Sequence, residues 1–242
     1  MTVQGIDHII IAVRSVGDAL DLFSGSGFTM TPVGEHLKFK SKNTLAMLDD
    51  AYLEIAAPTA RESFGEALTN HLDKDGEGFF GVVFGHHNAK AFAELMDLSY
   101  TEAEREVDTE LLRGVATFRV AWLPDGTIQN TFCFVVEHAT PELVWHPELQ
   151  VHENGANTVQ TLYLRSASPR DAAVTLRRQL NLPKSDSPIV AMHQNTITFL
   201  SPDEMAIKWG DSARAAIDFS GRENLEKKSL FNGQLILNFI ST

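Results

Sequence analysis

GIDHIIIAVRSVGDALDLFSGSGF, residues 5–28, is the stretch that decides the fold, together with AYLEIAAP at residues 51–58. Residues 8–13 are apolar and largely β-branched, which predicts a strand buried on both faces. A capping-box spacing at Ser15 and an apolar stripe that ends at two glycines predict a short helix. Further strands are expected over residues 28–33, 44–48 and 52–57. The stretch therefore predicts one βαβββ unit.

The strand–helix opening recurs at two later points of the chain. FFGVVF, residues 79–84, starts a second copy, with later strands expected over residues 116–123 and 131–138. Residues 159–164 start a third copy, with strands expected over residues 189–192, 196–200 and 205–209 and another over 234–240. The acidic run Glu102–Glu110 is predicted to be a solvated helical face. Periods of roughly 70–80 residues favour a duplicated supersecondary unit over a solenoid.

These repeats predict an α+β fold made of repeated βαβββ modules. We expect residues 1–140 to hold two paired modules that form a cupped sheet. Residues 141–156, which contain proline, glycine and two histidines, are the expected connector. Residues 157–242 are expected to form a third βαβββ-like module with a C-terminal strand.

Composition limits the partners and the compartment. The chain carries a net charge of −12 and has no Lys/Arg cluster, which argues against nucleic acid and anionic membranes as partners. Its single cysteine, Cys133, cannot form an intrachain disulfide and lies in an apolar run. Neither a signal peptide nor an apolar run long enough to span a bilayer is evident. We therefore expect a cytoplasmic protein.

The candidate chemistry begins with two polar residues in apolar strands, His8 and Glu54. A buried carboxylate is costly unless a cation, a metal or a hydrogen-bond donor compensates it. Glu137 lies at the matching place in the second unit, and imidazole with carboxylates suits a divalent metal such as Mn, Fe, Co, Ni or Zn. The structural alternatives are a hydrogen-bonded strand-end histidine at position 8 and a Glu54–Arg119 ion pair.

These residues carry a resemblance to a known family. Residues 7–23 followed by AYLEIAAP resemble the vicinal oxygen chelate superfamily, the glyoxalase and bleomycin-resistance fold. Residues 123–126 (LPDG), 132–138 (FCFVVEH) and 145–156 (WHPELQVHENGA) are similar to its glyoxalase-like subgroup. The resemblance covers roughly residues 5–165.

The resemblance implies a metal cup whose ligands come from the first and fourth strands of each module. His8 and Glu54 match the two ligands of the first module, and Glu137 matches the fourth-strand ligand of the second. The remaining position falls on residues 79–81, none of which binds metal. Three protein ligands, recruitment of His36 or His152, and loss of the metal are the alternatives. The residues expected to bind the ligand are His36, Trp145, His146 and His152.

The resemblance implies a metal-dependent enzyme for a small oxygenated or carbonyl compound, with isomerase, epimerase, lyase and dioxygenase chemistry all open. Glu54 and Glu137 are the expected catalytic bases, acting on a proton next to a carbonyl. The alternatives are a metal-free protein that sequesters a small molecule, as bleomycin-resistance relatives do, and a structural module. A homodimer is expected.

Overall fold

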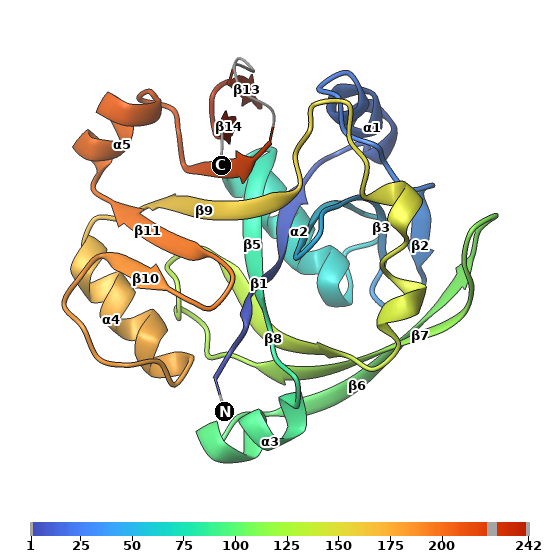
Figure 1. Ribbon diagram of the computed structural model, residues 1–242, viewed down its shortest axis with the longest axis horizontal. Coiled ribbons are helices and arrows are strands. Elements are labelled where there is room, and N and C mark those ends of the chain that lie inside the picture. Colours follow the sequence, from blue (N-terminus) through green and yellow to red (C-terminus); the bar gives the residue numbers. More distant parts are fainter. Residues whose placement is uncertain (1, 222–226, 241–242) are drawn as a thin grey trace.

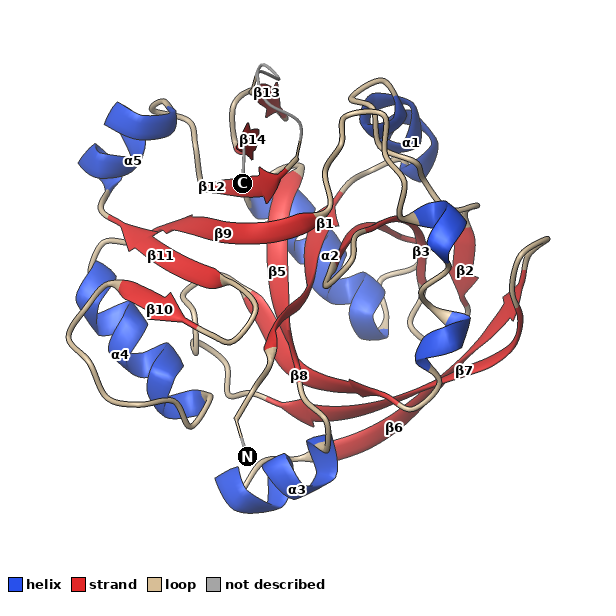
Figure 2. Ribbon diagram, viewed as in Figure 1, coloured by secondary structure: helices blue, strands red, loops and turns tan. Residues whose placement is uncertain are grey.

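The computed structural model describes residues 2–221 and 227–240, which fold into two curved sheets with short helices packed around them (Figures 1 and 2). The larger sheet has eight strands in this part of the chain. Their spatial order is β2 (Gly34–His36), β3 (Ser41–Met47), β4 (Tyr52–Pro58), β1 (Gly5–Ala12), β5 (Gly78–Gly85), β8 (Phe132–His138), β7 (Arg113–Trp122) and β6 (Tyr100–Asp108). The α+β prediction is confirmed.

Two similar halves meet at the centre of this sheet. Strand β1 runs parallel to β4, β5 runs parallel to β8, and β1 and β5 pair antiparallel. All eight residues of β1 are buried, as its apolar run predicts. The β1–β4 register places His8 opposite Tyr52 and Ile10 opposite Glu54. This register brings the polar residues of the first unit to the middle of the sheet.

The smaller sheet repeats the arrangement with shorter strands. Its order is β10 (Ile189–Ala191), β11 (Thr196–Leu200), β9 (Thr158–Arg165), β12 (Ala215–Ser220), β14 (Leu235–Ile240) and β13 (Lys228–Leu230). Strand β9 is parallel to β11, β12 is parallel to β14, and β9 and β12 are antiparallel. The C-terminal part therefore contains two abbreviated halves of its own.

The helices connect strands or cover sheet faces (Figure 2). They are α1 (Val16–Ser24), α2 (Ser63–Lys74), α3 (Ala89–Met96), α4 (Pro169–Gln179), α5 (Pro202–Trp209) and the 3₁₀ turns Pro141–Leu143 and Pro147–Leu149. The predicted cap of α1 is present, because the Ser15 hydroxyl accepts a hydrogen bond from Asp18 N at 3.2 Å. In the described part of the chain, no helix has the length and apolar character needed to cross a membrane.

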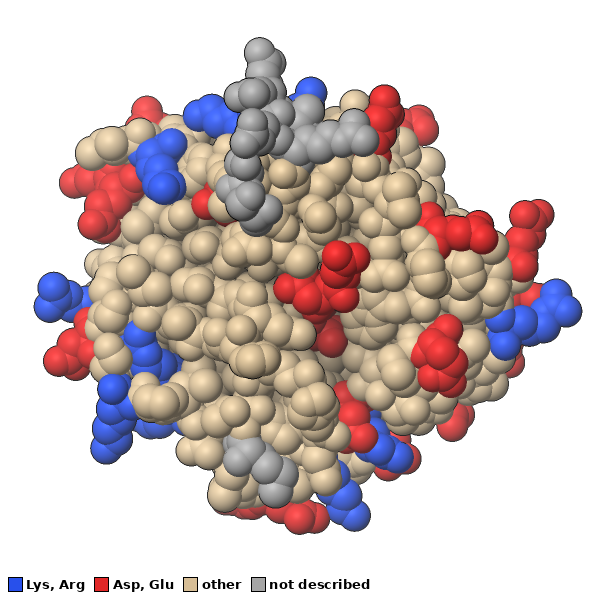
Figure 3. Space-filling model, viewed as in Figure 1, with Lys and Arg blue, Asp and Glu red and all other residues tan. Residues whose placement is uncertain are grey.

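One continuous apolar core joins the two sheets. Ile9 and Ile11 of β1 lie in the same buried cluster as Leu162 of β9 and Phe219 of β12. The opposite face of β1 presents His8, Ile10 and Ala12 to the concave side of the large sheet. The face of the molecule in Figure 3 carries both charge signs, with Lys and Arg mainly at its rim.

Three predicted elements are wrong. Residues 28–33 are not a strand, and the short β2 follows them. Residues 100–108 form strand β6 rather than a solvated helix, because charged and inward-facing residues alternate there with a period of two. The expected strand 205–209 is helix α5, which Pro202 and a Ser201–Glu204 capping box initiate.

Candidate functional site

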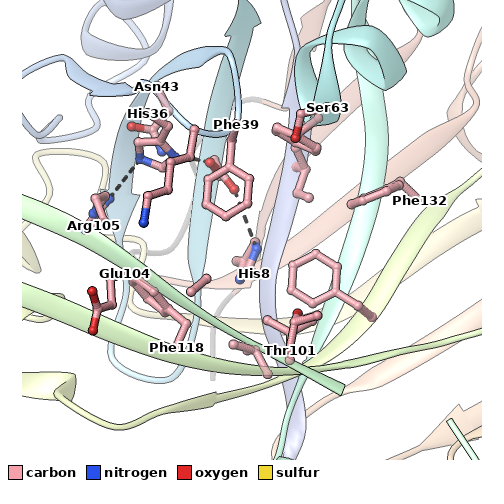
Figure 4. Close-up of a pocket in the computed structure, with 18 of the residues that line it drawn as sticks. His8, His36, Phe39, Asn43, Ser63, Thr101, Glu104, Arg105, Phe118 and Phe132 are labelled. Atoms are coloured by element: carbon pink, nitrogen blue, oxygen red, sulfur yellow. Dashed lines mark hydrogen bonds and ion pairs between the residues drawn. The ribbon is translucent and has the colours of Figure 1, made fainter. Parts of the chain in front are cut away.

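The concave face of the large sheet encloses a cavity of about 710 Å³, which we call the cup (Figure 4). Its polar part is lined by His8, His36, Asn43, Tyr52, Glu54 and Arg105. Its apolar part includes five aromatic residues that we call the aromatic wall: Phe64, Phe118, Trp122, Phe132 and Phe134. The polar group comes mainly from the first half of the sheet and the wall mainly from the second.

His8 is held from two sides. Its Nδ1 donates a hydrogen bond to Asp7 Oδ1 at 2.7 Å, and its ring stacks on Tyr52 with 4.5 Å between the ring centroids. Only Nε2 is left to face the cup, where it lies 3.6 Å from Glu54 Oε2. The fold thus fixes the orientation of the imidazole ring.

Glu54 is a buried carboxylate with one neutral donor, since Oε1 accepts a hydrogen bond from Asn43 Nδ2 at 2.7 Å. Arg119, the expected alternative partner, pairs with Glu137 instead. A buried carboxylate with no cationic Lys or Arg partner among the described residues is costly unless a function retains it. His8 and Glu54 therefore form a confined pair of titratable side chains that line the cup.

Tyr52 completes this end of the cup as a neutral group. Burial, with Asp7 and Glu54 adding to it, raises the pKa of the Tyr52 phenol well above its usual value. The phenol therefore stays protonated at neutral pH.

Sequence reasoning missed Asp7 and His138, which extend the site beneath its surface. His138 Nε2 donates to both oxygens of Asp7 at 3.0 Å, so this carboxylate lies between two imidazoles. Burial alone would raise the pKa of Asp7, but His138 and His8 together hold it well below its ordinary value. Asp7 and His138 are 131 residues apart, and only the adjacency of Asp7 to His8 was visible in the sequence.

Glu137 is not brought to His8 and Glu54. Along β8, Phe132, Phe134 and Val136 line the cup, so alternation directs Glu137 to the other face of the sheet. There it pairs with Arg119 at 2.5 Å and accepts a hydrogen bond from Ala89 N at the start of α3. The Glu137 carboxylate therefore stabilises the contact between β8, Arg119 and the start of α3, on the side of the sheet away from the cup.

The strand register explains why the second half lacks ligands. Ile10 pairs with Glu54 in the first half, and His8 precedes Ile10 by two residues. In the second half Gly81 pairs with Phe132 and Val83 with Phe134, so aromatic residues occupy the fourth-strand positions. No group of three or more potential metal-ligating His, Cys, Asp or Glu side chains occurs within residues 2–221 and 227–240.

The four expected ligand-binding residues lie in four different surroundings. His36 lines the cup, and its Nε2 lies 3.5 Å from Arg105 Nη1. Trp145 lies behind the cup, against Tyr52 and His138. His146 accepts a hydrogen bond from Glu148 N in its own turn and does not line the cup.

His152 has a structural position. It is buried, its Nδ1 accepts from Thr29 N at 2.9 Å, and its Nε2 donates to Met47 O at 2.6 Å. These two bonds attach the connector to the first half of the large sheet. Burial lowers the pKa of His152, which favours the neutral ring that this pairing needs.

Comparisons with known proteins agree with this architecture. A family model described as a glyoxalase-like domain matches residues 6–180. A hypothetical protein from Staphylococcus aureus, 12% identical, has a similar fold over 98% of this chain and 99% of its own, with a TM-score of 0.70. The search of curated proteins found no match.

Smaller solved structures resemble part of the chain. A Streptomyces coelicolor methylmalonyl-CoA epimerase variant is 20% identical over 57% of this chain and 99% of its own, with a TM-score of 0.45. The Mycobacterium tuberculosis methylmalonyl-CoA epimerase is 16% identical over 60% and 94%, with a TM-score of 0.46. Because the family model covers well over half of the chain, this protein belongs to the glyoxalase-like domain family.

Proposed function

We propose that this protein is an enzyme that binds a small carbonyl compound in the cup and moves a proton on the carbon next to the carbonyl. The observation that carries this proposal is the buried His8–Glu54 pair, which faces a cavity large enough for a small molecule. The aromatic wall supplies an apolar surface for the body of the compound.

Glu54 and His8 have different roles in this proposal. Glu54 takes the proton from the substrate carbon, and the electron pair of that bond moves onto the carbonyl oxygen to form an enolate. In its protonated form, His8 donates from Nε2 to this oxygen. Asp7 and Asn43 hold the two groups in place. Return of a proton to the opposite face of the carbon gives the epimer, and protonation at the former carbonyl carbon, with loss of the enol proton to form a new carbonyl, gives an isomer.

The expected divalent metal, whether Fe, Mn, Zn, Ni or Co, was assigned to His8, Glu54 and Glu137. Relatives in the superfamily commonly use such a metal, and the bond from His8 Nδ1 to Asp7 is typical of a metal-ligating histidine. The residues present do not complete a ligand set, however, because Glu137 faces the other side of the sheet and the second half contributes aromatic rings. We therefore assign the proton transfer to protein groups.

Metal-free sequestration is the second candidate, and the aromatic wall favours it. Phe132 stacks on Phe80 at 5.2 Å between centroids, and Trp122 contacts Phe134 at 5.3 Å. Such a surface holds planar ligands without chemistry. Both halves of the cup come from one chain, so neither function requires a second copy. The homodimer stays a prediction, which light scattering on purified protein tests.

Binding and metal content together separate these functions. Purified protein, prepared without chelator, is analysed for metal and then titrated with thiol adducts, enolisable acids and catechols. The proposal predicts binding with solvent exchange of the substrate proton, and loss of exchange in Glu54→Gln. Binding with no exchange for any compound supports sequestration. Near-stoichiometric metal that disappears in both His8→Ala and Glu54→Ala restores the metal-dependent alternative.

A further inference from the structure

A further charged group, Arg105, faces the cup and lies far from His8 and Glu54 in the sequence. Arg105 lies on β6, where alternation places it on the inward face with Val107. It lines the cup and also the adjoining cavity of about 820 Å³ between β2, β6 and the connector. Its guanidinium lies over the Phe118 ring, 5.8 Å from the centroid (Figure 4).

Arg105 lacks the acidic partner that four other arginines have. Arg61, Arg113, Arg119 and Arg214 each form an ion pair with Asp or Glu. Within residues 2–221 and 227–240, Arg105 forms none, and its buried Nε has no hydrogen-bond acceptor. Arg177 is also buried without an acidic partner, but its guanidinium donates to three backbone carbonyls. Among the described residues, the guanidinium of Arg105 has only His36 as a hydrogen-bond partner.

The groups around Arg105 leave its charge available. Glu54 lines the same cup, but its oxygens face Asn43 and His8. Glu102 and Glu104 also line the cup, and Glu106 lines the adjoining cavity, but all three side chains are exposed. Glu102 pairs with Arg119 at 3.7 Å, and among the described residues none of the three forms an ion pair with Arg105. Lys38 also lines the cup and forms no ion pair with the acidic side chains of the described residues. Arg105 and Lys38 are therefore cup-lining cations that no carboxylate of the described residues pairs with.

His36 supports this arrangement as a neutral neighbour. Burial lowers the pKa of the His36 imidazole; the charge of Glu54 opposes this shift, and the charge of Arg105 adds to it. A neutral ring can accept a hydrogen bond from Arg105 Nη1 through Nε2. The contact restrains the planar fork of the guanidinium.

We propose that Arg105 binds the carboxylate of the substrate, so that the substrate class is a small carboxylic acid with an aromatic or apolar body. A guanidinium fork matches a carboxylate with two parallel hydrogen bonds. The body of the acid lies against the aromatic wall, beginning at Phe118 beneath the guanidinium. The proposal rests on the proposed function, because it assumes that the same cup holds the reacting compound.

Binding of matched acids and amides tests this inference. The probes are 3-phenylpropanoate and 2-naphthoate, each compared with its primary amide by calorimetric titration. We expect the wild-type protein to bind each acid more tightly than its amide. Arg105→Met removes this preference and weakens acid binding about 10–100-fold, the effect of losing a charged hydrogen-bond partner. Arg105→Lys recovers part of the affinity, since it keeps the charge but not the fork.

Arg170→Gln is the matched control, because it removes the same charge from an exposed position on α4. Its affinity for acids should equal that of the wild type. Thermal unfolding without ligand shows whether each variant is folded. If Arg105→Met does not fold, Lys38→Met removes a second cation that lines the cup. Lys38→Met should weaken acid binding without changing amide binding.

Three outcomes overturn the inference, and they differ in what they say about the proposed function. The inference is overturned if acids and amides bind with equal affinity, or if Arg105→Met binds acids as tightly as the wild type does. In either case, binding of the amides in the cup leaves the proposed function standing. Absence of binding by every probe overturns both. Arg105-dependent acid binding supports the inference, and it stands even if no enolisable acid exchanges its proton, which contradicts the proposed function alone.

Discussion

Asp7 shows how much of this site depends on single residues below its surface. Its carboxylate accepts hydrogen bonds from His8 and from His138, and all three side chains are more than nine-tenths buried. Charged groups in such surroundings are stable only when they are paired and hydrogen-bonded. The hydrogen bonds of Asp7 therefore both orient His8 in the cup and stabilise the fold around it.

Asp7→Asn should lower the free energy of unfolding at pH 7 by about 3–5 kcal/mol, as expected when one member of a buried charged pair is removed. The pKa of Asp7 is lowered in the folded protein, so its contribution is present above about pH 4 and is lost as the pH falls further. Urea unfolding from pH 3 to pH 7 measures both effects. Asp21→Asn, on exposed α1, is the control, and equal losses in the two variants would contradict the prediction.

The elements show which parts of the site the sequence could predict. The buried run of β1 and the single carboxylate of β4 marked His8 and Glu54, because both strands are apolar enough for a polar residue to stand out. Strand β8 is substantially buried on both faces, so its pattern did not reveal which face meets the cup. The sequence therefore predicted wrongly that the face of β8 with Glu137 meets the cup. Contacts over long sequence distances, such as Asp7–His138, leave no local signal in the sequence.

Glu137→Gln separates the two faces of β8. The variant loses the ion pair with Arg119 and weakens the contact with the start of α3, so its thermal midpoint should fall modestly. Ligand affinity and proton exchange in the cup should remain within about twofold of wild type, since distant changes usually cost under 0.5 kcal/mol. Titration and exchange assays on Glu137→Gln and Glu54→Gln provide the comparison. Equal loss of exchange in both would return Glu137 to the site.

At the scale of the whole molecule, the two sheets depend on each other. The convex face of the large sheet contributes Ile9, Ile11, Leu53 and Phe84 to the core shared with the C-terminal sheet. Strand β8 of the large sheet ends at His138 and β9 of the small sheet begins at Thr158, and the sequence did not show that one core crosses this junction. Strand β12 was also not predicted, and it completes the second antiparallel centre.

A fragment of residues 1–157 should therefore fail to fold cooperatively. Exposing each large apolar side chain of the shared core costs about 1.5–3 kcal/mol, against a total stability of about 5–15 kcal/mol for a typical protein. Circular dichroism during heating and binding of a hydrophobic dye measure the outcome. A monomeric fragment with a sharp unfolding transition would show that the N-terminal part is independent.

The junction between the sheets contains a titrating group, Asp50, whose carboxylate accepts from Val159 N at 3.4 Å. Burial raises the pKa of Asp50 to about 6, so the folded state loses stability as the pH rises from about 4 to about 6. Asp50→Asn keeps the acceptor and removes the charge. Its thermal midpoint should rise relative to wild type between pH 4 and pH 7.5. A difference that does not change with pH would contradict this assignment.

The most direct test of the proposed function is exchange of a substrate proton with solvent deuterium. Enolisable aromatic oxo acids are incubated with the protein in D₂O, and the signal of the proton next to the carbonyl is followed by NMR. We expect the wild type to accelerate its loss and Glu54→Gln to reduce that acceleration at least about 100-fold, the usual contribution of a positioned base. Exchange that is undiminished in Glu54→Gln would contradict the assignment of the cup as the catalytic site.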